Sequence, residues 1–87
     1  MINASLISVE EVLHVFGALT LMARASESGS LEIGSDLDLF DASRVVIGKA
    51  VVRKFLSSRN PEIVPIEISL VDDSTDVKSI KFCRKAS

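Results

Sequence analysis

Apolar residues in the first third of the chain recur at the spacing of a helix. From residue 9 to residue 25 they lie mostly three or four positions apart, which places them on one stripe of an α-helix: Val9, Val12, Leu13, Phe16, Leu19 and Ala23. Ser8 is followed three residues later by Glu11, the pattern of a capping box at the first turn of a helix. The pattern therefore predicts a helix that begins at Ser8 and runs to residue 25.

A second apolar segment predicts another helix, from Asp41 to about Ser58. Asp41 is a suitable N-cap, and Asn60 and Pro61 end the segment because the residue before proline is driven out of the helical region. The β-branched run at residues 45–47 leaves a strand as the alternative. The apolar residues would occupy most of the helix circumference, so this helix is expected to be buried on two sides: Val45, Val46, Ile47, Ala50, Val51, Val52, Phe55 and Leu56.

Shorter segments have the alternation that is typical of strands. Apolar and polar residues alternate from Ile63 to Val71 and again from Val77 to Arg84, with a polar turn at residues 72–76 between them, which predicts a β-hairpin. Leu31 to Ile33 and Ala4 to Ile7 are candidate short strands. The predicted order is β-α-β-α-β-β, an α+β two-layer sandwich with a mixed four-stranded sheet, two helices and right-handed crossovers.

Length and composition indicate one small globular domain over residues 1–87. Of its 87 residues, 47% are hydrophobic and 25% are charged, which excludes an intrinsically disordered chain. The mean hydropathy of +0.36 is high for a soluble monomer and suggests self-association. The formal net charge of −2 and the pI near 5.3 provide no overall positive field that would attract nucleic acid or an anionic membrane.

The few residues suited to site chemistry are isolated in the sequence. A single cysteine, Cys83, makes no internal disulfide, and with the single histidine, His14, it is too little for a metal site. His14 has no serine, cysteine or aspartate at an activating spacing, so we expect neither an enzyme nor a cofactor. Neighbouring cations could lower the pKa of the Cys83 thiol, but an inert cysteine is the simpler interpretation.

The longest apolar run is too short to cross a bilayer. Residues 12–25 are interrupted by polar side chains and fall below the roughly 20 residues that a membrane helix needs. Glu10 and Glu11 stand where a signal peptide would carry basic residues. A cytoplasmic protein without membrane contact is therefore expected.

Basic residues are concentrated in the second predicted helix and in the last strand. Residues 44–59 carry five bases and no acid, whereas residues 1–43 carry seven acids and one base. A solvated helix surface is the alternative to phosphate contacts, because Arg44, Lys49 and Lys54 would lie on different sides of a helix. The candidate nucleic-acid-binding residues are Arg44, Lys49, Arg53, Lys81, Arg84 and Lys85.

Short strings of residues resemble the Alba family of archaeal chromatin proteins. The strings are residues 18–21, Ala-Leu-Thr-Leu, in the first predicted helix, Ser43-Arg44 at the start of the second, Arg53 near its end, and residues 81–85, Lys-Phe-Cys-Arg-Lys, in the last strand. The resemblance covers nearly the whole chain. It implies the sandwich fold described above and a homodimer that binds DNA or RNA.

The chain departs from the Alba pattern where that family binds nucleic acid. Residues 7–11 replace a pair of lysines, residues 36–41 replace a Gly-Arg step, and the tip of the expected hairpin is short and acidic. Only Arg44 carries over, as the basic residue early in the second helix. The alternative function is therefore a non-enzymatic interaction module, an acidic relative that pairs with a basic family member and no longer binds nucleic acid itself.

The expected function is a small nucleic-acid-binding homodimer. It would bind the backbone and shape of DNA or RNA, because no set of side chains here suits base-edge recognition. The expected dimer interface is formed by Val52, Phe55 and Leu56, since a helix that is apolar around most of its surface needs a partner on one side.

Overall fold

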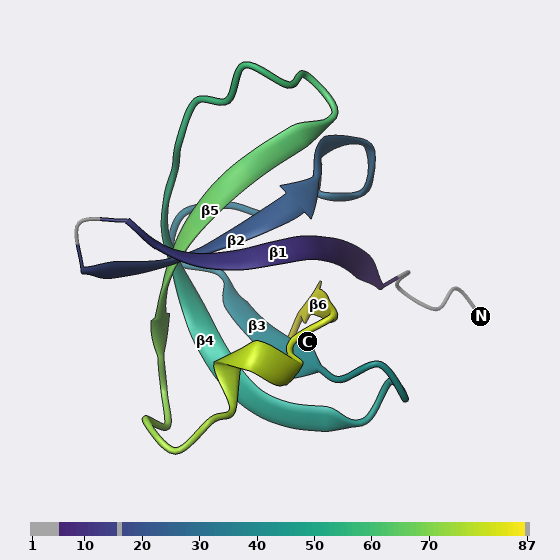
Figure 1. Ribbon diagram of the computed structural model, residues 1–87, viewed down its shortest axis with the longest axis vertical. Helices are drawn as coiled ribbons and strands as arrows, with labels where there is room; N and C mark the ends of the chain where they lie inside the picture. The colour runs from purple at the N-terminus through teal and green to yellow at the C-terminus, as the bar shows by residue number, and fades with distance from the viewer. Residues whose placement is uncertain (1–5, 16, 87) are drawn as a thin grey trace.

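In the computed structural model, which describes residues 6–15 and 17–86, the chain forms one closed barrel of antiparallel strands (Figure 1). The order around the barrel is β1-β2-β5-β4-β3-β6. No helix in the described residues is long and apolar enough to cross a membrane. The strands are β1 (Ile7–Val15), β2 (Ala18–Arg24), β3 (Asp36–Phe40), β4 (Val46–Phe55), β5 (Ile63–Leu70) and β6 (Phe82–Lys85), with short 3-10 helices η1 (Ala25–Glu27) and η2 (Val77–Ser79).

The predicted first helix is wrong, because residues 8–25 form β1, β2 and the start of η1. An irregularity between Val9 and Glu11 shifts the register of β1 against β2, and this adds one residue to the two-residue alternation of a strand. Val9 and Val12 are therefore three positions apart, as they would be on a helix. The turn at Gly17, whose φ of +80° is readily adopted by glycine, then joins two strands that look like one apolar run. Phe16, also in the predicted stripe, lies outside the described residues.

The predicted second helix is also wrong, since its apolar segment is β4. Ala50 and Val52 face the barrel core, while Val51 between them is partly exposed and Val46, beyond a register irregularity, is exposed. Apolar residues on both faces of a strand resemble a helix that is apolar all round. The strand alternative raised by the β-branched residues at its start is the correct one.

The predicted strand at residues 63–71 is β5, but only residues 82–84 of the predicted strand at 77–84 belong to β6, because residues 77–79 form η2, and β5 and β6 do not form a hairpin. β5 pairs with β2 and β4, whereas β6 pairs with β1 and β3. The α+β sandwich with two helices and a mixed four-stranded sheet, the layout implied by the Alba resemblance, is thus replaced by a barrel in which all pairs are antiparallel. Residues 31–33 are not a strand, and the first strand begins at Ile7; Ala4 lies outside the described residues.

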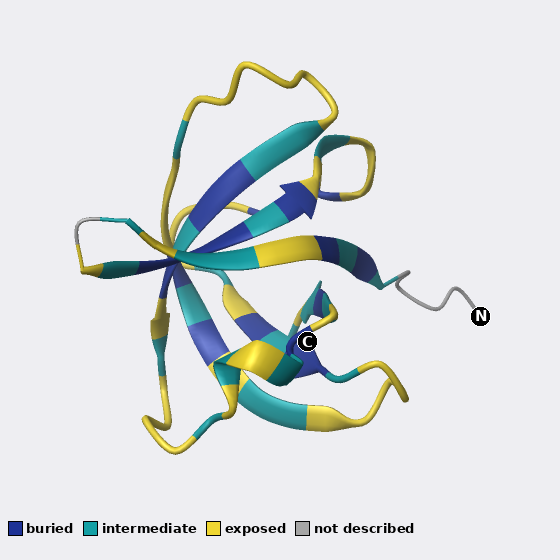
Figure 2. Ribbon diagram, in the orientation of Figure 1, coloured by how far each residue is buried: buried dark blue, intermediate teal, exposed yellow. Residues whose placement is uncertain are grey.

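The core is formed by the side chains that alternate toward the inside of the barrel. Leu21 and Ala23 of β2, Leu37 and Leu39 of β3, and Ile66 of β5 are completely buried. Dark blue and lighter bands alternate along several strands in Figure 2, as expected when successive side chains point to opposite faces. The interior is therefore filled with side chains, as in other small barrels.

The connection between β5 and β6 crosses the barrel and packs against β4. Thr75 in this connection lies against Gly48, so closely that a Cβ atom at Gly48 would overlap the Thr75 side chain, 2.7 Å from its Cγ2. The Thr75 hydroxyl donates a hydrogen bond to the carbonyl of Asp72 at 2.9 Å. Gly48 is therefore required for this close approach.

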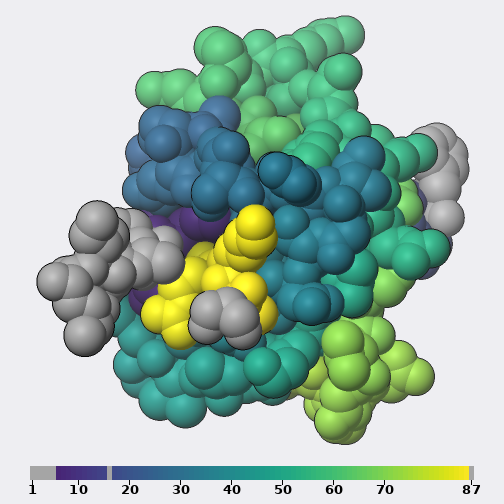
Figure 3. All heavy atoms as spheres, turned by 180° about the vertical axis from the view of Figure 1, so that it is seen from behind, coloured from purple at the N-terminus to yellow at the C-terminus, as the bar shows by residue number. Residues whose placement is uncertain are grey.

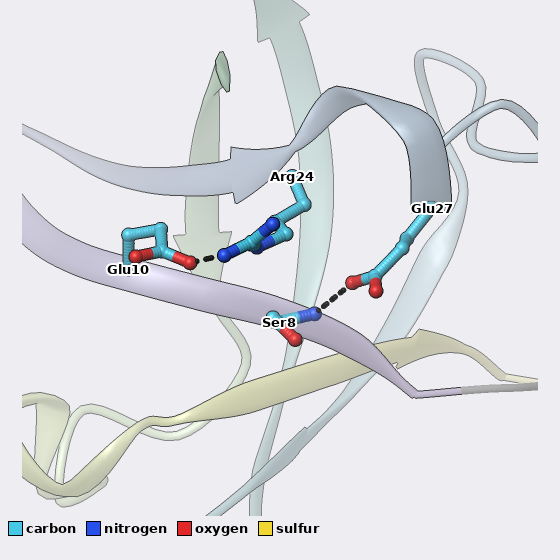
Figure 4. A network of polar contacts seen from close by, with 4 residues as sticks. All are labelled: Ser8, Glu10, Arg24 and Glu27. Carbon is cyan, nitrogen blue, oxygen red and sulfur yellow. Dashed lines mark hydrogen bonds and ion pairs between the residues drawn. The ribbon is translucent and has the colours of Figure 1, made fainter. Parts of the chain in front are cut away.

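A polar network ties η1 back to β1 (Figure 4). The backbone N–H of Ser8 donates to the Glu27 carboxylate at 2.8 Å, and the Arg24 guanidinium donates to Glu10 at 2.9 Å. Hydrogen bonding to Glu10 raises the pKa of Arg24. These contacts hold the end of the β1–β2 hairpin beside the position where β6 joins the barrel.

Candidate nucleic-acid interface

The turn between β3 and β4 holds Arg44 in an unusual backbone conformation. Asp41 and Val45 close the turn, with Asp41 N–H donating to the Val45 carbonyl at 3.0 Å and Arg44 N–H donating to the Asp41 carbonyl at 2.9 Å. The Asp41 carboxylate accepts from the N–H groups of Ser43 and Val45. Arg44 has φ of +65°, in the left-handed region that the last residue of a three-residue hairpin loop adopts and that glycine usually occupies.

The guanidinium groups of two arginines lie over aromatic rings. Arg44 Cζ is 5.5 Å from the centre of the Phe82 ring, and Arg84 Cζ is 5.0 Å from the centre of the Phe40 ring. Phe40 of β3 pairs directly with Phe82 of β6, so the two rings belong to neighbouring strands. Cation–π attraction over these rings fixes both guanidinium groups on the outer face of the barrel.

Asp38 joins three strands on the same outer face. It pairs with Lys49 of β4 on one side and with Arg84 of β6 on the other. Its carboxylate oxygens lie 2.8 Å from Lys49 Nζ and 3.9 Å from Arg84 Nη2. The Lys49 side chain remains 62% exposed, so its ammonium group can still reach a ligand.

A hollow of about 260 Å³ lies between the β3–β4 turn and the η2 segment. We call it the turn hollow. Lys81 is anchored next to it, because its N–H donates to the Phe40 carbonyl at 2.8 Å and its carbonyl accepts from Val9 N–H at 2.9 Å. The hollow is lined by Asp41, Ala42, Ser43, Lys78, Ser79 and Lys81.

The predicted basic residues divide into a clustered group and two outlying ones. Arg44, Lys49, Lys81 and Arg84 lie on or beside β4, β3 and β6. Arg53 and Lys85 lie toward the other end of these strands, where Asp36 of β3 pairs with Val51 and the Ala86 N–H donates to the Asp36 carbonyl. We define the basic face as Arg44, Lys49, Lys78, Lys81 and Arg84.

The three predicted interface residues do not share one environment. Val52 is 1% exposed and belongs to the barrel core, so it is not available to a partner. Phe55 is 36% exposed at the end of β4, and Leu56 is partly buried just after it.

The residues weighed for chemistry remain apart. His14 lines a second hollow of about 380 Å³ that also includes Glu67 and Asp73, but the described residues contain no group of three side chains that could hold a metal ion. Burial, and to a lesser extent Glu27, raises the pKa of the Cys83 thiol to about 12, so this cysteine is not an activated nucleophile. Hydrogen bonds from Ser74 lower the pKa of Asp72 in the β5–β6 connection.

Sequence reasoning missed the two aromatic rings that contact Arg44 and Arg84, of which Phe40 is buried. Phe40 and Phe82 are separated by 41 intervening residues and meet only because β3 pairs with β6. Asp38 bridges Lys49 and Arg84, a role that its place in the sequence does not indicate. The sequence signal for these contacts is weak: Phe40 lies four positions before Arg44, and Phe82 lies two positions before Arg84.

Comparisons with protein-family models, curated proteins and solved structures found no match to this chain.

Proposed function

We propose that this protein binds the sugar-phosphate backbone of DNA or RNA through the basic face, without reading base edges. The observation that carries the proposal is Arg44, an arginine in a left-handed turn position with its guanidinium over Phe82. The proposal rests on this geometry and not on the Alba resemblance. The activity is binding alone.

The backbone conformation of Arg44 favours a role for its side chain. A left-handed residue costs an L-amino acid roughly 1–2 kcal/mol, which glycine avoids. The cation–π contact of Arg44 with the Phe82 ring stabilises the folded state by only about 0.5–1 kcal/mol at an exposed site. Folding alone would therefore favour glycine at this position, and a ligand for the guanidinium explains the arginine.

The two ring-bound guanidinium groups are suited to phosphate. A guanidinium presents several N–H donors in a plane that matches the oxygens of a phosphate, and it can also stack on a base. The Phe82 and Phe40 rings restrict Arg44 and Arg84, so less rotamer freedom is lost when a ligand binds. The side chain of Arg84 is 37% exposed and remains accessible to such a ligand.

The acidic net charge does not contradict a basic face. Residues 36–49 and 76–85 together carry six bases and four acids, whereas the rest of the chain carries four bases and eight acids. Two of the four acids, Asp41 and Asp76, accept hydrogen bonds from backbone N–H groups, and Asp38 is paired with two bases. These two segments together therefore carry a net positive charge within a chain whose net charge is −2.

Binding measured across a salt series tests the proposal. Fluorescence anisotropy with labelled 12-nucleotide DNA and RNA strands and a 16-base-pair duplex should give an affinity that falls linearly on a log-log plot against salt. Each lost phosphate contact should reduce the slope by about 0.7 for a single strand and 0.9 for a duplex. We expect this reduction in Arg44→Gln and Arg84→Gln.

Matched controls remove the same charge elsewhere. Lys54, opposite Glu67 on the β4–β5 side of the barrel, and Arg59 in the β4–β5 connection are exposed, so Lys54→Gln and Arg59→Gln should leave the slope unchanged. Equal losses in the controls, or no binding at 20 mM salt, would show that the basic face is not a nucleic-acid site. If the protein instead retains a basic protein on an affinity column, the interaction-module alternative replaces the proposal.

We also propose that the protein acts in the cytoplasm as a homodimer. Its one cysteine, Cys83, is a free and fully buried thiol, which suits a reducing compartment. Phe55 is 36% exposed, and a second copy would cover this remaining apolar surface.

A further inference from the structure

We propose that the turn hollow seats one phosphate group, and this rests on the proposed function in so far as the phosphate belongs to a nucleic-acid backbone. The hollow, of about 260 Å³, is many times larger than the roughly 10–15 Å³ that one water molecule needs by the same measure. It opens between two segments far apart in the sequence, the β3–β4 turn and the η2 segment. It therefore exists only in the folded barrel.

Two lysines supply positive charge from backbone positions that the fold fixes. Lys81 is held between β1 and β3 by its backbone hydrogen bonds to Val9 and Phe40. Lys78 is held in η2, where its N–H donates to the Asp76 carboxylate at 3.2 Å. Both side chains are exposed, and within the described residues neither makes an ion pair.

The β3–β4 turn contributes two side chains to the hollow: Ser43, a neutral hydrogen-bond donor, and Asp41, whose negative charge repels a phosphate. The Ser43 side chain lines the hollow and, in the described part of the chain, makes no hydrogen bond, so its hydroxyl can donate to a phosphate oxygen. Asp41 also lines the hollow, but its carboxylate is needed to accept from the N–H groups of Ser43 and Val45. Arg44, the next residue after Ser43, holds its guanidinium over the Phe82 ring.

Asp41 permits a specific test. Its negative charge repels a phosphate, whereas its side-chain oxygen accepts the hydrogen bonds of the turn. Asn at this position keeps the oxygen that accepts from the turn and removes the negative charge. Asp41→Asn should therefore retain the fold and bind phosphate about fivefold more tightly, the effect of one unit charge at contact distance in water. A purely structural role for Asp41 would give no such increase.

The experiment combines two ligands. Inorganic phosphate, titrated against chloride at constant ionic strength, should shift the amide NMR signals of Ser43, Ser79 and Lys81. Lys78→Gln and Lys81→Gln should abolish these shifts. Each variant should also reduce the salt slope for a 12-nucleotide single strand by about 0.7, and Lys54→Gln should not.

The outcomes separate this site from the general function. Phosphate shifts at the turn hollow without oligonucleotide binding would keep the site, assign it to a small phosphate compound and overturn the proposed function. Oligonucleotide binding that Lys78→Gln and Lys81→Gln leave unchanged would overturn the site alone. Absence of a gain in Asp41→Asn would also overturn it.

Discussion

Arg44 combines an unfavourable backbone conformation with a favourable side-chain contact, and two substitutions separate these effects. Arg44→Ala and Arg44→Gly both lose the contact with Phe82, but only alanine retains a Cβ in the left-handed conformation. We expect the glycine variant to be more stable than the alanine variant by about 1 kcal/mol. Urea unfolding followed by circular dichroism measures this difference.

The same two variants test what the arginine is for. Both should bind a single-stranded oligonucleotide with the same reduced salt slope, because both lack the guanidinium. A glycine variant that binds as well as the wild type would contradict a ligand role for Arg44. Equal stability of the two variants would show that the left-handed conformation is not costly at this turn.

Burial of Cys83 gives the stability of the protein a dependence on alkaline pH. Its pKa is raised from an ordinary 9.0 to about 12, so the folded state keeps a proton that the unfolded state loses in this interval. This contribution is fully present below about pH 9 and is lost as the pH rises toward 12, at about 1.4 kcal/mol per pH unit. The free energy of unfolding, measured by urea titration at several pH values, should show this slope.

Cys83→Ala separates the thiol from the lysines and arginines that also titrate at high pH. The wild type should lose more stability than this variant between pH 9 and pH 10.5. In addition, a thiol reagent at pH 8 should modify Cys83 only after denaturant is added, because the side chain is completely buried. Parallel pH profiles for the two proteins would refute the assignment.

At the scale of elements, the β5–β6 connection depends on a glycine in β4. A Cβ at residue 48 would overlap the Thr75 side chain, so Gly48→Ala should destabilise the protein by about 1–3 kcal/mol. Thr75→Ala removes the overlapping oxygen and methyl group and should restore most of the loss. Thermal unfolding of both single variants and the double variant measures the coupling.

If the effects of the two substitutions simply add, the contact between Gly48 and Thr75 does not hold the connection in place. Because η2 follows Thr75 and lines the turn hollow, Gly48→Ala should also weaken phosphate binding.

The sequence permits prediction of strands only where their alternation is unbroken. β5 was found because its apolar residues alternate through the strand, although its predicted partner was wrong. β1 and β4 were mistaken for helices because register irregularities, between Val9 and Glu11 and between Val52 and Lys54, interrupt the alternation. A bulge adds one residue to a period of two, and the result resembles the spacing of a helix.

The candidate site was predictable only in part, for a related reason. Basic residues such as Arg44 and Arg84 stand out in any sequence, but their partners depend on which strands pair. Asp38 meets both Lys49 and Arg84 through the β4–β3–β6 order, which joins residues up to 46 positions apart. No local pattern encodes such long-range pairing.

At the scale of the whole molecule, self-association through Phe55 and Leu56 stays a prediction. Phe55 is 36% exposed, so covering the rest of its side chain contributes about a third of the value for full burial of a phenylalanine, roughly 0.5–1 kcal/mol per copy. In sedimentation experiments we expect a wild-type dimer that survives high salt and a monomer for Phe55→Asp. A wild type of 9.4 kDa at all concentrations would contradict the dimer, as would a variant that stays dimeric and folded.

The barrel is closed by a short seam between its first and last strands. β6 meets β1 at only two residue pairs, Ile7 with Cys83 and Ser8 with Phe82, while β1 meets β2 at six. Figure 3 shows the C-terminal residues in yellow at the surface beside the purple N-terminal strand. One further backbone hydrogen bond crosses the seam, from the Val9 N–H to the Lys81 carbonyl at 2.9 Å.

The short β1–β6 seam is the place where the barrel would open if two molecules exchanged strands by domain swapping. Parting these two residue pairs and the hydrogen bond between Val9 and Lys81 turns a closed ring of strands into an open sheet with two free edges, and free edges recruit other chains. The last strand of one molecule can then complete the ring of another at little cost in contacts.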